Sequence, residues 1–290
     1  MIFSWVFNLL ALFFFVRSGL PATVNPDLTL LNQDLSVKAP LVEAQRSAVL
    51  DKGGRFYFWS ARGDETQPIA SITKLMTALV FLENNPGWDT PYQVTADDHI
   101  TGGHLNLFLG DRVTVKDLFM TSLVASDNGA TMALVHATGL SETDFVKKMN
   151  EKAQALGLLN THFVDPVGLS DGDESTAREV TQLAKAALSR PEISQATESQ
   201  SYDFTTLGGK AISIASTDEL LTDTASGSLR ILGGKTGYTD QAGYCFVGRF
   251  QAPDGREVIA AVLNAVGKND RFTETESLAN WVFKSFKTQP

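Results

Sequence analysis

The segments with strand character stand at the two ends of this chain, and the segments with helical periodicity stand between them. Near the N-terminal end, "SAVLDKGGRFYFW" consists of two apolar runs around a turn, which indicates a β-hairpin. In the last third, "LRILGGKTGYT", "GYCFVGRF" and "REVIAAVLNAV" predict three strands joined by short turns. We therefore predict an α+β fold, in which one antiparallel sheet unites the hairpin with the C-terminal strands and is flanked by helices.

The middle of the chain predicts an all-helical subregion beside that sheet. A helix is expected to begin at Ser71 and to end at "NNPG", and another follows Thr114 and Asp117, which resemble a capping box. Further helical stretches are "GATMALVHATG", "ETDFVKKMNEKAQAL", "TAREVTQLAKAALSR" and, at the C-terminal end, "RFTETESLANWVFKSF". "SYDFTT" and "AISIAS" indicate a short outlying hairpin.

Composition and charge limit the classes of function. The 290 residues are 43% hydrophobic, which is enough for one large domain or two small ones. The net charge of −9 argues against a nucleic-acid partner, because such a partner requires a basic patch. The lone Cys245 has apolar neighbours on a predicted strand and is expected to be buried. No metal site is expected, since the four histidines show no metal-ligand spacing: His99, His104, His136 and His162.

The N-terminal segment predicts export. Residues 1–16 carry no charge, and the apolar run Ile2–Val16 is shorter than the ~20 residues that a bilayer-spanning helix needs. The run matches the apolar core of a secretory signal, with Ala22 as the best candidate for its last residue. An uncleaved N-terminal anchor is the alternative. We expect a signal peptide or anchor over 1–22, a linker over 23–37 and a folded domain over 38–290.

The helix that begins at Ser71 places a hydroxyl and an amine on one face. Ser71 and Lys74 are three residues apart, so their side chains lie one turn apart on the same side. A serine becomes nucleophilic when a base removes its proton, and a buried lysine can be that base because desolvation lowers its pKa. Leu75, Met76 and Leu79 supply apolar surroundings. An isolated S-x-x-K, however, is more often a capping serine and a surface lysine.

Two further tripeptides make the pattern specific. Ser-Asp-Asn at Ser126–Asn128 stands at a break between predicted helices, where side chains can point into a cleft. Lys-Thr-Gly at Lys235–Gly237 stands within a predicted strand. The set S-x-x-K, S-D-N and K-T-G, in this order and on helix, loop and strand, is that of class A β-lactamases and penicillin-binding proteins. The chain therefore resembles the serine penicillin-recognising enzymes.

Longer matches narrow the resemblance to the D-alanyl-D-alanine carboxypeptidases, the low-molecular-weight penicillin-binding proteins of peptidase family S11. They are "QPIASITKLMTAL", "FVKKMNEKAQALGLLNTHFVDPVGL", "STARE", "GGKTGYTDQAGYCFVGRF" and "RFTETESLANWVF", and they run from about residue 40 to the end. The resemblance implies a β-lactamase/transpeptidase-like fold and a serine D,D-peptidase domain over 38–290 that uses no cofactor. It implies a peptidoglycan stem peptide ending in D-Ala-D-Ala as substrate and β-lactams as covalent inhibitors. Such an enzyme acts in the periplasm or at the outer face of the cytoplasmic membrane, and here only the N-terminal segment is available for membrane attachment.

The resemblance also implies roles for individual residues. Ser71 would attack the carbonyl between two D-alanines and form an acyl-enzyme, with Lys74 as its base. Ser126 would relay a proton to the leaving amine. Asn128 would place Ser126, and its amide would hold the substrate's peptide. Lys235 would bind the terminal carboxylate of the substrate.

The other expected site residues surround that carboxylate and the oxyanion. Thr236 would hydrogen-bond the same carboxylate, and Gly237 would let the substrate lie close to the strand. The backbone N–H groups of Ser71 and Tyr238 would form the oxyanion hole. Arg271, near the start of the last helix, is the candidate for an arginine that faces the carboxylate. A solvated arginine at a helix start is the alternative.

Three alternatives accompany the carboxypeptidase interpretation. A D,D-endopeptidase of the same family would use the same residues. A β-lactamase shares all three motifs, and Ser-Asp-Asn is its spelling where carboxypeptidases more often have Ser-Gly-Asn. However, the Glu-x-x-Leu-Asn stretch of a class A β-lactamase has Leu156 here in place of glutamate. A penicillin-binding sensor that acylates without turnover is disfavoured by the intact Ser71, Lys74, Ser126 and Lys235.

Overall fold

The two ends of the described chain lie together. The computed structural model describes residues 32–100, 102–103, 105–222 and 229–287, so the predicted leader over 1–22 and His104 lie outside the described residues. The described end of the predicted linker over 23–37 contains the short strand β1 (Asn32–Gln33), which pairs with β13 (Phe286–Lys287). Within the described ranges, no helix combines the length and apolar character needed to cross a membrane.

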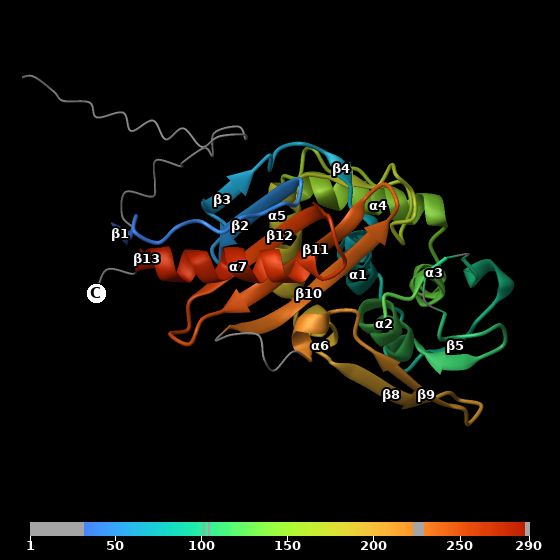
Figure 1. Cartoon of the computed structure of the whole chain (residues 1–290). Helices are drawn as coiled ribbons and strands as arrows, with labels where there is room; N and C mark the ends of the chain where they lie inside the picture. The colour runs from blue at the N-terminus through green and yellow to red at the C-terminus, as the bar shows by residue number, and fades with distance from the viewer. Residues whose placement is uncertain (1–31, 101, 104, 223–228, 288–290) are drawn as a thin grey trace, which may run out of the picture.

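The predicted antiparallel sheet is confirmed, and it joins the N-terminal hairpin to the C-terminal strands. Its five strands follow the order β10-β11-β12-β2-β3 (Figure 1). They are β2 (Arg46–Asp51), β3 (Tyr57–Ala61), β10 (Arg230–Thr239), β11 (Gly243–Gln251) and β12 (Glu257–Ala265). β12 pairs with β2 from Val258 opposite Asp51 to Leu263 opposite Arg46. This pairing closes the sheet between segments from opposite ends of the sequence.

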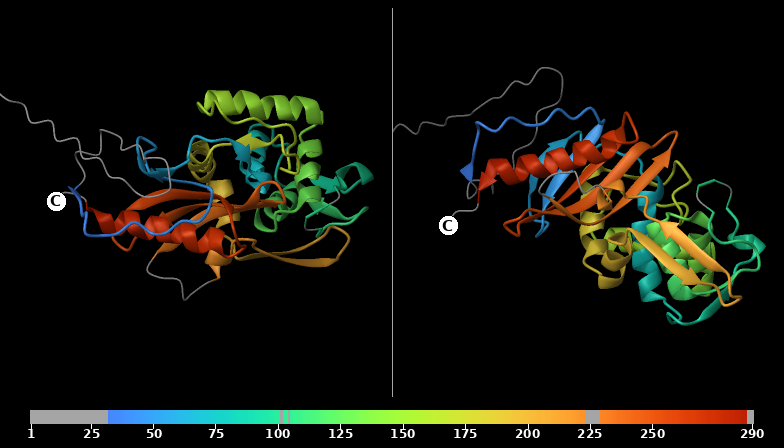
Figure 2. Two further views of the ribbon diagram at one scale, coloured as in Figure 1. Left: turned by 45° about the horizontal axis from the view of Figure 1, so that its top comes forward. Right: turned by 60° about the horizontal axis from the view of Figure 1, so that its bottom comes forward.

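Helices cover both faces of the sheet. Successive strand residues point to opposite sides, and the apolar residues on each side pack against a different set of helices. Val49 packs with the buried residues of α7 (Asp270–Ser285). Its neighbour Leu50 packs in the larger core on the other side, which includes α5 (Ala177–Leu188). Figures 1 and 2 show α7 along one face and α5 behind the other. Cys245 in β11 is fully buried, as predicted.

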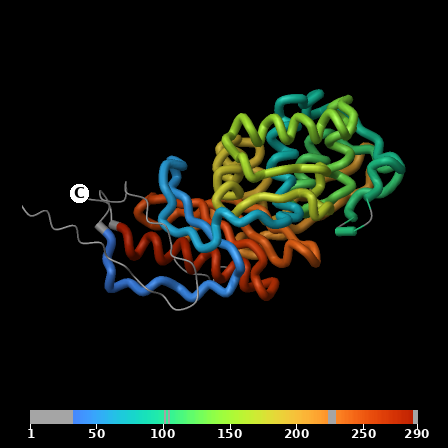
Figure 3. Tube along the Cα trace, turned by 90° about the horizontal axis from the view of Figure 1, so that it is seen from above, coloured from blue at the N-terminus to red at the C-terminus, as the bar shows by residue number. Residues whose placement is uncertain are grey.

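The predicted helical subregion lies beside the sheet, as the view from above shows (Figure 3). Its helices are α1 (Lys74–Glu83), α2 (Val115–Val124), α3 (Asn128–Ala137) and α4 (Glu142–Ala155). The predicted capping box is confirmed: Thr114 Oγ1 accepts from the N–H of Asp117, whose side chain in turn accepts from the N–H of Thr114. α1 is buried from residue 74 to 81, which identifies it as the central helix.

Several short elements complete the fold. The predicted outlying hairpin is confirmed as β8 (Ser201–Thr205) and β9 (Ala211–Ala215). Besides β1 and β13, four short strands and one short helix were not predicted: β4 (Gln67–Pro68), β7 (Glu174–Ser175), β5 (Pro91–Gln93), β6 (Arg112–Thr114) and α6 (Pro191–Thr197). Strands of two or three residues are too short to show a period. Among the described residues the 3-10 helices are η2 (Ala70–Thr73), η3 (Ala96–Asp98) and η4 (Glu219–Leu221).

Candidate active site

Ser71 lies at the entrance to the central helix. It belongs to η2, which runs directly into α1, so the expected helix begins here as a 3-10 turn. The Nζ of Lys74 lies 2.9 Å from the Oγ of Ser71, which is hydrogen-bond distance. Ala70, immediately before the serine, has a φ of +49°. This left-handed conformation costs a non-glycine residue about 1–3 kcal/mol and persists only where the surrounding structure enforces it.

Lys74 is fully buried among three oxygen acceptors. Besides the Oγ of Ser71, its Nζ donates to the Oδ1 of Asn128 and to the backbone carbonyl of Val167, both at 2.6 Å. Burial lowers the pKa of Lys74 to about 7, and nearby carboxylates, first of all Asp165, act in the opposite direction. A lysine with this pKa is neutral in a large fraction of molecules at neutral pH. It can therefore accept the proton of Ser71.

A second serine–lysine pair lies close to the first. The Nζ of Lys235 donates to the Oγ of Ser126 at 2.8 Å and to the carbonyl of Thr236 at 3.1 Å. Burial, Lys74 and Arg271 all lower the pKa of Lys235. Sequence reasoning assigned Lys235 to the substrate and missed its contact with Ser126. No local pattern could have revealed this contact, because it joins a strand to a turn on another element.

The middle residue of the Ser-Asp-Asn motif has a structural role. The motif occupies the break between α2 and α3, as predicted, and Ser126 has a φ of +57°. The Oδ1 of Asp127 accepts from the N–H of Ala130 at 2.9 Å and so caps α3. Its Oδ2 accepts from the backbone and side-chain N–H groups of Asn106, at 2.7 and 2.9 Å. Asp127 thereby fixes both the turn and the loop that borders it.

Asn128 connects the same loop to the buried lysine. Its Nδ2 donates to the carbonyl of Gly102 at 3.0 Å, and its Oδ1 accepts from Lys74. Because Gly102 offers an acceptor, the Nδ2 faces the loop and the Oδ1 faces the lysine. The hydrogen bonds of Asn128 thus orient Lys74. The roles expected for Asn128 toward Ser126 and toward the substrate stay predictions.

The loop over residues 164–173 forms the other side of the lysine pocket. The carboxylate of Asp165 accepts from four backbone N–H groups, those of Val167, Gly168, Leu169 and Ser170. The Oδ1 of Asp173 accepts from the N–H groups of Val164 and Asp165, and burial raises the pKa of Asp173 to about 7. The loop presents the carbonyl of Val167 to Lys74. The sequence showed an Asp-, Gly- and Pro-rich loop here without indicating this function.

Gly168 lets this loop touch the segment that carries the serine. It has a φ of +84°, and a Cβ on it would lie 2.1 Å from the carbonyl oxygen of Ala70. Gly255 has a similar φ of +85°, and a Cβ on it would meet nothing within 4 Å. The two glycines share a backbone conformation and differ in their surroundings.

We expect Gly168→Ala to lower the free energy of unfolding by about 3 kcal/mol, from left-handed strain together with overlap against Ala70. Gly255→Ala should carry the strain alone and cost about 1 kcal/mol. Denaturant unfolding measures both values. Acylation should slow in the Gly168 variant and stay unchanged in the Gly255 variant. Equal losses of stability in the two variants would show that the contact with Ala70 is unimportant.

A cleft of about 520 Å³ brings the predicted site residues together. Seven of them line it: Ser71, Ser126, Asn128, Thr236, Gly237, Tyr238 and Arg271. Lys74 and Lys235 are buried beneath its surface, where each reaches the serine of its pair. Over the described part of the chain, no three His, Cys, Asp or Glu side chains are grouped to hold a metal ion.

Arg271 lies at one end of the cleft and is not a solvated arginine. It is 5% exposed, its Nη1 donates to the carbonyl of Gly237 at 3.4 Å, and its guanidinium lies 4.6 Å from the ring centroid of Phe272. Nearby, the hydroxyls of Thr236 and Thr217 are 2.7 Å apart. The part of the cleft formed by Arg271, Thr236 and Thr217, called the Arg271 end below, therefore brings hydroxyl groups and a buried cation together.

Position 237 requires a glycine because a neighbouring backbone segment of the same chain packs closely against it. A Cβ on it would lie 2.6 Å from the carbonyl oxygen of Ile69, in the segment just before Ser71. The predicted close approach of a substrate stays a prediction. The ring of Tyr238 is half-exposed and stacks on that of Tyr244, with 4.4 Å between the ring centroids.

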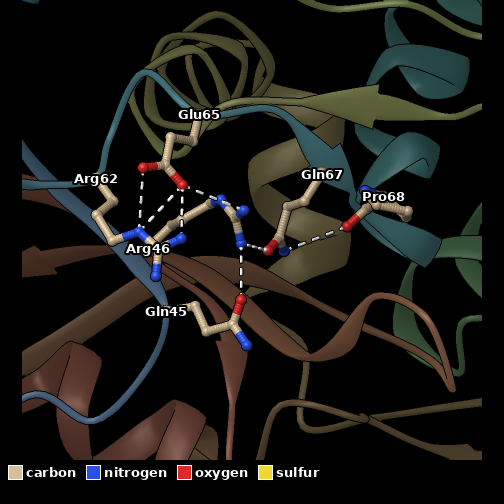
Figure 4. Close-up of polar contacts among 6 residues, drawn as sticks. All are labelled: Gln45, Arg46, Arg62, Glu65, Gln67 and Pro68. Atoms are coloured by element: carbon tan, nitrogen blue, oxygen red, sulfur yellow. Dashed lines mark hydrogen bonds and ion pairs between the residues drawn. The ribbon is translucent and has the colours of Figure 1, made fainter.

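A polar network holds the strand that leads to Ser71 (Figure 4). The Nη1 of Arg46 donates to the Oε1 of Gln67 at 2.7 Å, and its Nη2 pairs with Glu65 at 3.3 Å. The Nε2 of Gln67 lies 3.7 Å from the Sγ of Cys245 in the central sheet. Because Arg46 belongs to β2 and Gln67 to β4, the network ties the serine-bearing segment to the sheet.

Comparison with known proteins identifies the family of the chain that carries this site. A model of the D-alanyl-D-alanine carboxypeptidase family matches residues 33–267. A D-alanyl-D-alanine endopeptidase of Escherichia coli is 31% identical over 247 residues, which cover 84% of this chain and 78% of the relative. A D-alanyl-D-alanine carboxypeptidase of the same organism is 32% identical over 266 residues, covering 87% of this chain and 64% of the relative. The structure of a D-alanyl-D-alanine carboxypeptidase from Mycobacterium tuberculosis matches with a TM-score of 0.76 and 29% identity, over 87% of this chain and 96% of that one. The chain therefore belongs to the D-alanyl-D-alanine carboxypeptidase family, as its motifs predict, and is a peptidase.

Proposed function

We propose that this protein is a serine-type D-Ala-D-Ala carboxypeptidase with Ser71 as nucleophile and Lys74 as base. The observation that carries the proposal is the 2.9 Å contact between Lys74 Nζ and Ser71 Oγ, in a buried pocket that lowers the pKa of Lys74 to about 7. The Oγ attacks the carbonyl carbon of the penultimate D-alanine, and its proton passes to Lys74. The amide bond then breaks, the terminal D-alanine leaves, and water hydrolyses the ester.

The second pair is proposed to serve the leaving group. The amine of the departing D-alanine needs a proton, and the Oγ of Ser126 can deliver one and take one back from the Nζ of Lys235, which donates to it at 2.8 Å. Asn128 keeps Lys74 oriented through its Oδ1. The backbone N–H groups of Ser71 and Tyr238 are proposed to bind the developing oxyanion.

The terminal carboxylate of the substrate is proposed to bind at the Arg271 end of the cleft. Thr236 and Thr217 supply hydroxyls there, and Lys235 and Arg271 supply positive potential from below. β-Lactams, which the family binds, carry a carboxylate in a comparable place relative to their reactive carbonyl. They are proposed to acylate Ser71 in the same orientation as the stem peptide.

A second activity is favoured by the relatives named D-alanyl-D-alanine endopeptidases in Escherichia coli and Haemophilus influenzae, which are 31% and 36% identical to this chain. An endopeptidase cuts the D-alanyl bond of a cross-link, where the leaving group is a whole second stem peptide. Both activities use the same chemistry at Ser71. They differ in the size of the leaving group, which is one D-alanine for the carboxypeptidase and a stem peptide for the endopeptidase.

Incubation with purified muropeptides tests both activities. We expect release of D-alanine from monomers that end in D-Ala-D-Ala, identified by mass spectrometry, and none with Ser71→Ala. Conversion of cross-linked dimers into monomers would add the endopeptidase activity. If neither substrate changes while the protein stays folded, the proposed function is wrong.

We also propose that the protein is exported, because the substrate lies outside the cytoplasmic membrane and Ile2–Val16 is an uncharged apolar run. A reporter active only outside the cytoplasm, fused after Pro290, should be active. Mass spectrometry of the N-terminus decides between cleavage near Ala22 and a retained anchor. Activity restricted to a cytoplasmic reporter would contradict export.

A further inference from the structure

Asp218 is a buried acid beneath the cleft that none of the roles above uses. It lies between Thr217 and Glu219, which both line the cleft, and it is itself 3% exposed. Its Oδ1 accepts from the N–H of Leu220 at 3.1 Å. Its Oδ2 is buried and has no hydrogen-bond partner among the residues that the structure describes. A buried carboxyl oxygen without a donor is costly when the group is ionised.

Asp218 follows Thr217, whose hydroxyl lies 2.7 Å from that of Thr236, so the charges that act on Asp218 include those of the Arg271 end of the cleft. Burial raises the pKa of Asp218 to about 7, while Lys235 of β10 and Arg271 of α7 favour its ionised form. The Nε of Arg271 is also buried and without a partner among the described residues. Glu219 opposes ionisation of Asp218, but it is partly exposed and paired with Lys268 at 2.6 Å. Asp218 and a bound carboxylate would therefore share the same two cations.

We propose that Asp218 is a positioning residue that couples binding of the substrate's terminal carboxylate to uptake of a proton. As a neutral acid it leaves Lys235 and Arg271 available to the substrate. As a carboxylate it competes with the substrate for them. The inference rests on the proposed function, because it requires the terminal carboxylate of the substrate to bind at this end of the cleft.

The sign of the effect follows from repulsion between like charges. A substrate carboxylate near Asp218 disfavours its ionised form, so binding raises the pKa of Asp218 above about 7. Affinity is then greatest below this pKa and falls as the pH rises through it. A rise of one unit corresponds to about a tenfold loss of affinity at high pH. With the same rise, about half a proton is taken up on binding near pH 7.5.

Two other groups can link binding to protons. Lys74 has a pKa of about 7, and the anion would raise it, so Lys74 also takes up protons on binding. Lys235 would contribute in the same direction, since its pKa is lowered by burial. Both groups still titrate when Asp218 is made neutral, and loss of this charge lowers the pKa of Lys235 further, because Asp218 raises it. The difference between the parent protein and Asp218→Asn therefore reports Asp218 together with its effect on Lys235.

The test is titration calorimetry in a Ser71→Ala background, with an N-acylated peptide ending in D-Ala-D-Ala. Measurements in buffers of different ionisation enthalpy give the number of protons taken up. Between about pH 6 and 8.5 we expect Asp218 to cost the parent about sevenfold in affinity, in addition to any loss that the parent shares with Asp218→Asn. The Asp218→Asn variant should take up about half a proton less near pH 7.5. Glu219→Gln removes a neighbouring charge that raises the pKa of Asp218, so it should shift the pH dependence slightly to lower pH while keeping the proton uptake that Asp218→Asn loses.

The outcomes separate the inference from the proposed function. Equal proton uptake by the parent and Asp218→Asn would overturn the inference. No binding of the peptide by a folded Ser71→Ala protein would instead overturn the proposed function. If Asp218→Asn does not fold, a peptide ending in D-Ala-D-Ala-amide replaces the variant. It lacks the terminal charge, so the inference requires a weaker pH dependence for the amide, and an equal dependence for both peptides would contradict it.

Discussion

Replacing Ser71 by alanine is expected to abolish covalent labelling by a fluorescent penicillin and to lower D-alanine release by about 10⁴-fold or more, as for loss of a catalytic nucleophile. The label requires an ester to the Oγ of Ser71, and the variant has no such atom. The variant removes one of the three hydrogen bonds of Lys74, which costs about 1 kcal/mol, so the fold should persist. Fluorescence of the denatured protein on a gel, together with a thermal unfolding curve, measures both effects.

Ser213→Ala is the matched control for this variant. Ser213 lines the same cleft from β9, and the mechanism gives it no role. The control should be labelled like the wild-type protein, which shows that removal of a hydroxyl from the cleft does not by itself prevent labelling. Persistent labelling of Ser71→Ala would place the nucleophile on another residue.

The structure also bears on the β-lactamase alternative. A class A β-lactamase needs a general base on the water that attacks the acyl-enzyme. Leu156, which stands in the expected glutamate position of the sequence pattern, is the C-cap residue of α4 and carries no such group. The carboxylate of Asp165 is occupied by four N–H groups of its own loop, and Asp173 accepts from two others. These acids shape the pocket of Lys74, which agrees with membership of the carboxypeptidase family.

The parts of the fold that the sequence predicts are those with a strong local signal. Apolar runs bounded by turn residues predict β2, β3 and the C-terminal strands, and capping residues such as Thr114 mark helix starts. The short pairs β4–β7 and β5–β6 escape prediction, because two or three residues carry no period. The pairing of β1 with β13 depends on where the ends of the chain meet, which no local pattern encodes.

The candidate site also has a part that the sequence predicts and a part that it does not. The three motifs identify the side chains that line or underlie the cleft, since each motif joins a residue type to a recognisable element. They do not reveal what those side chains contact. The bond from Lys235 to Ser126, the carbonyl of Val167 on Lys74 and the packing of Gly237 against Ile69 each join distant segments. Such contacts arise from tertiary packing, so only the structure can supply them.

Lys74→Arg is expected to lower the rate of acylation by penicillin by about 10³–10⁴-fold, the usual range for loss of a general base. Arginine keeps the positive charge but stays protonated at any accessible pH, so it cannot accept the proton of Ser71. The longer, forked side chain also does not match the three acceptors that surround the Nζ of Lys74. Stopped-flow measurement of acylation gives the rate. Lys74→Met, which keeps a similar volume without charge, is the control and should be equally slow.

The pH dependence distinguishes a base from a merely structural lysine. The pKa of Lys74 is lowered to about 7, so its neutral fraction grows as the pH rises, and the wild-type acylation rate should climb through about pH 7 to a plateau. The free energy of unfolding is also expected to increase as the pH rises. A lysine whose pKa is lower in the folded state than in the unfolded state destabilises the fold below about pH 7, and this cost disappears as the pH rises toward 10.5. Lys74→Met should therefore exceed the wild type in stability most clearly at low pH. An acylation rate that does not change across neutral pH would exclude Lys74 as the base, even if Lys74→Arg were inactive.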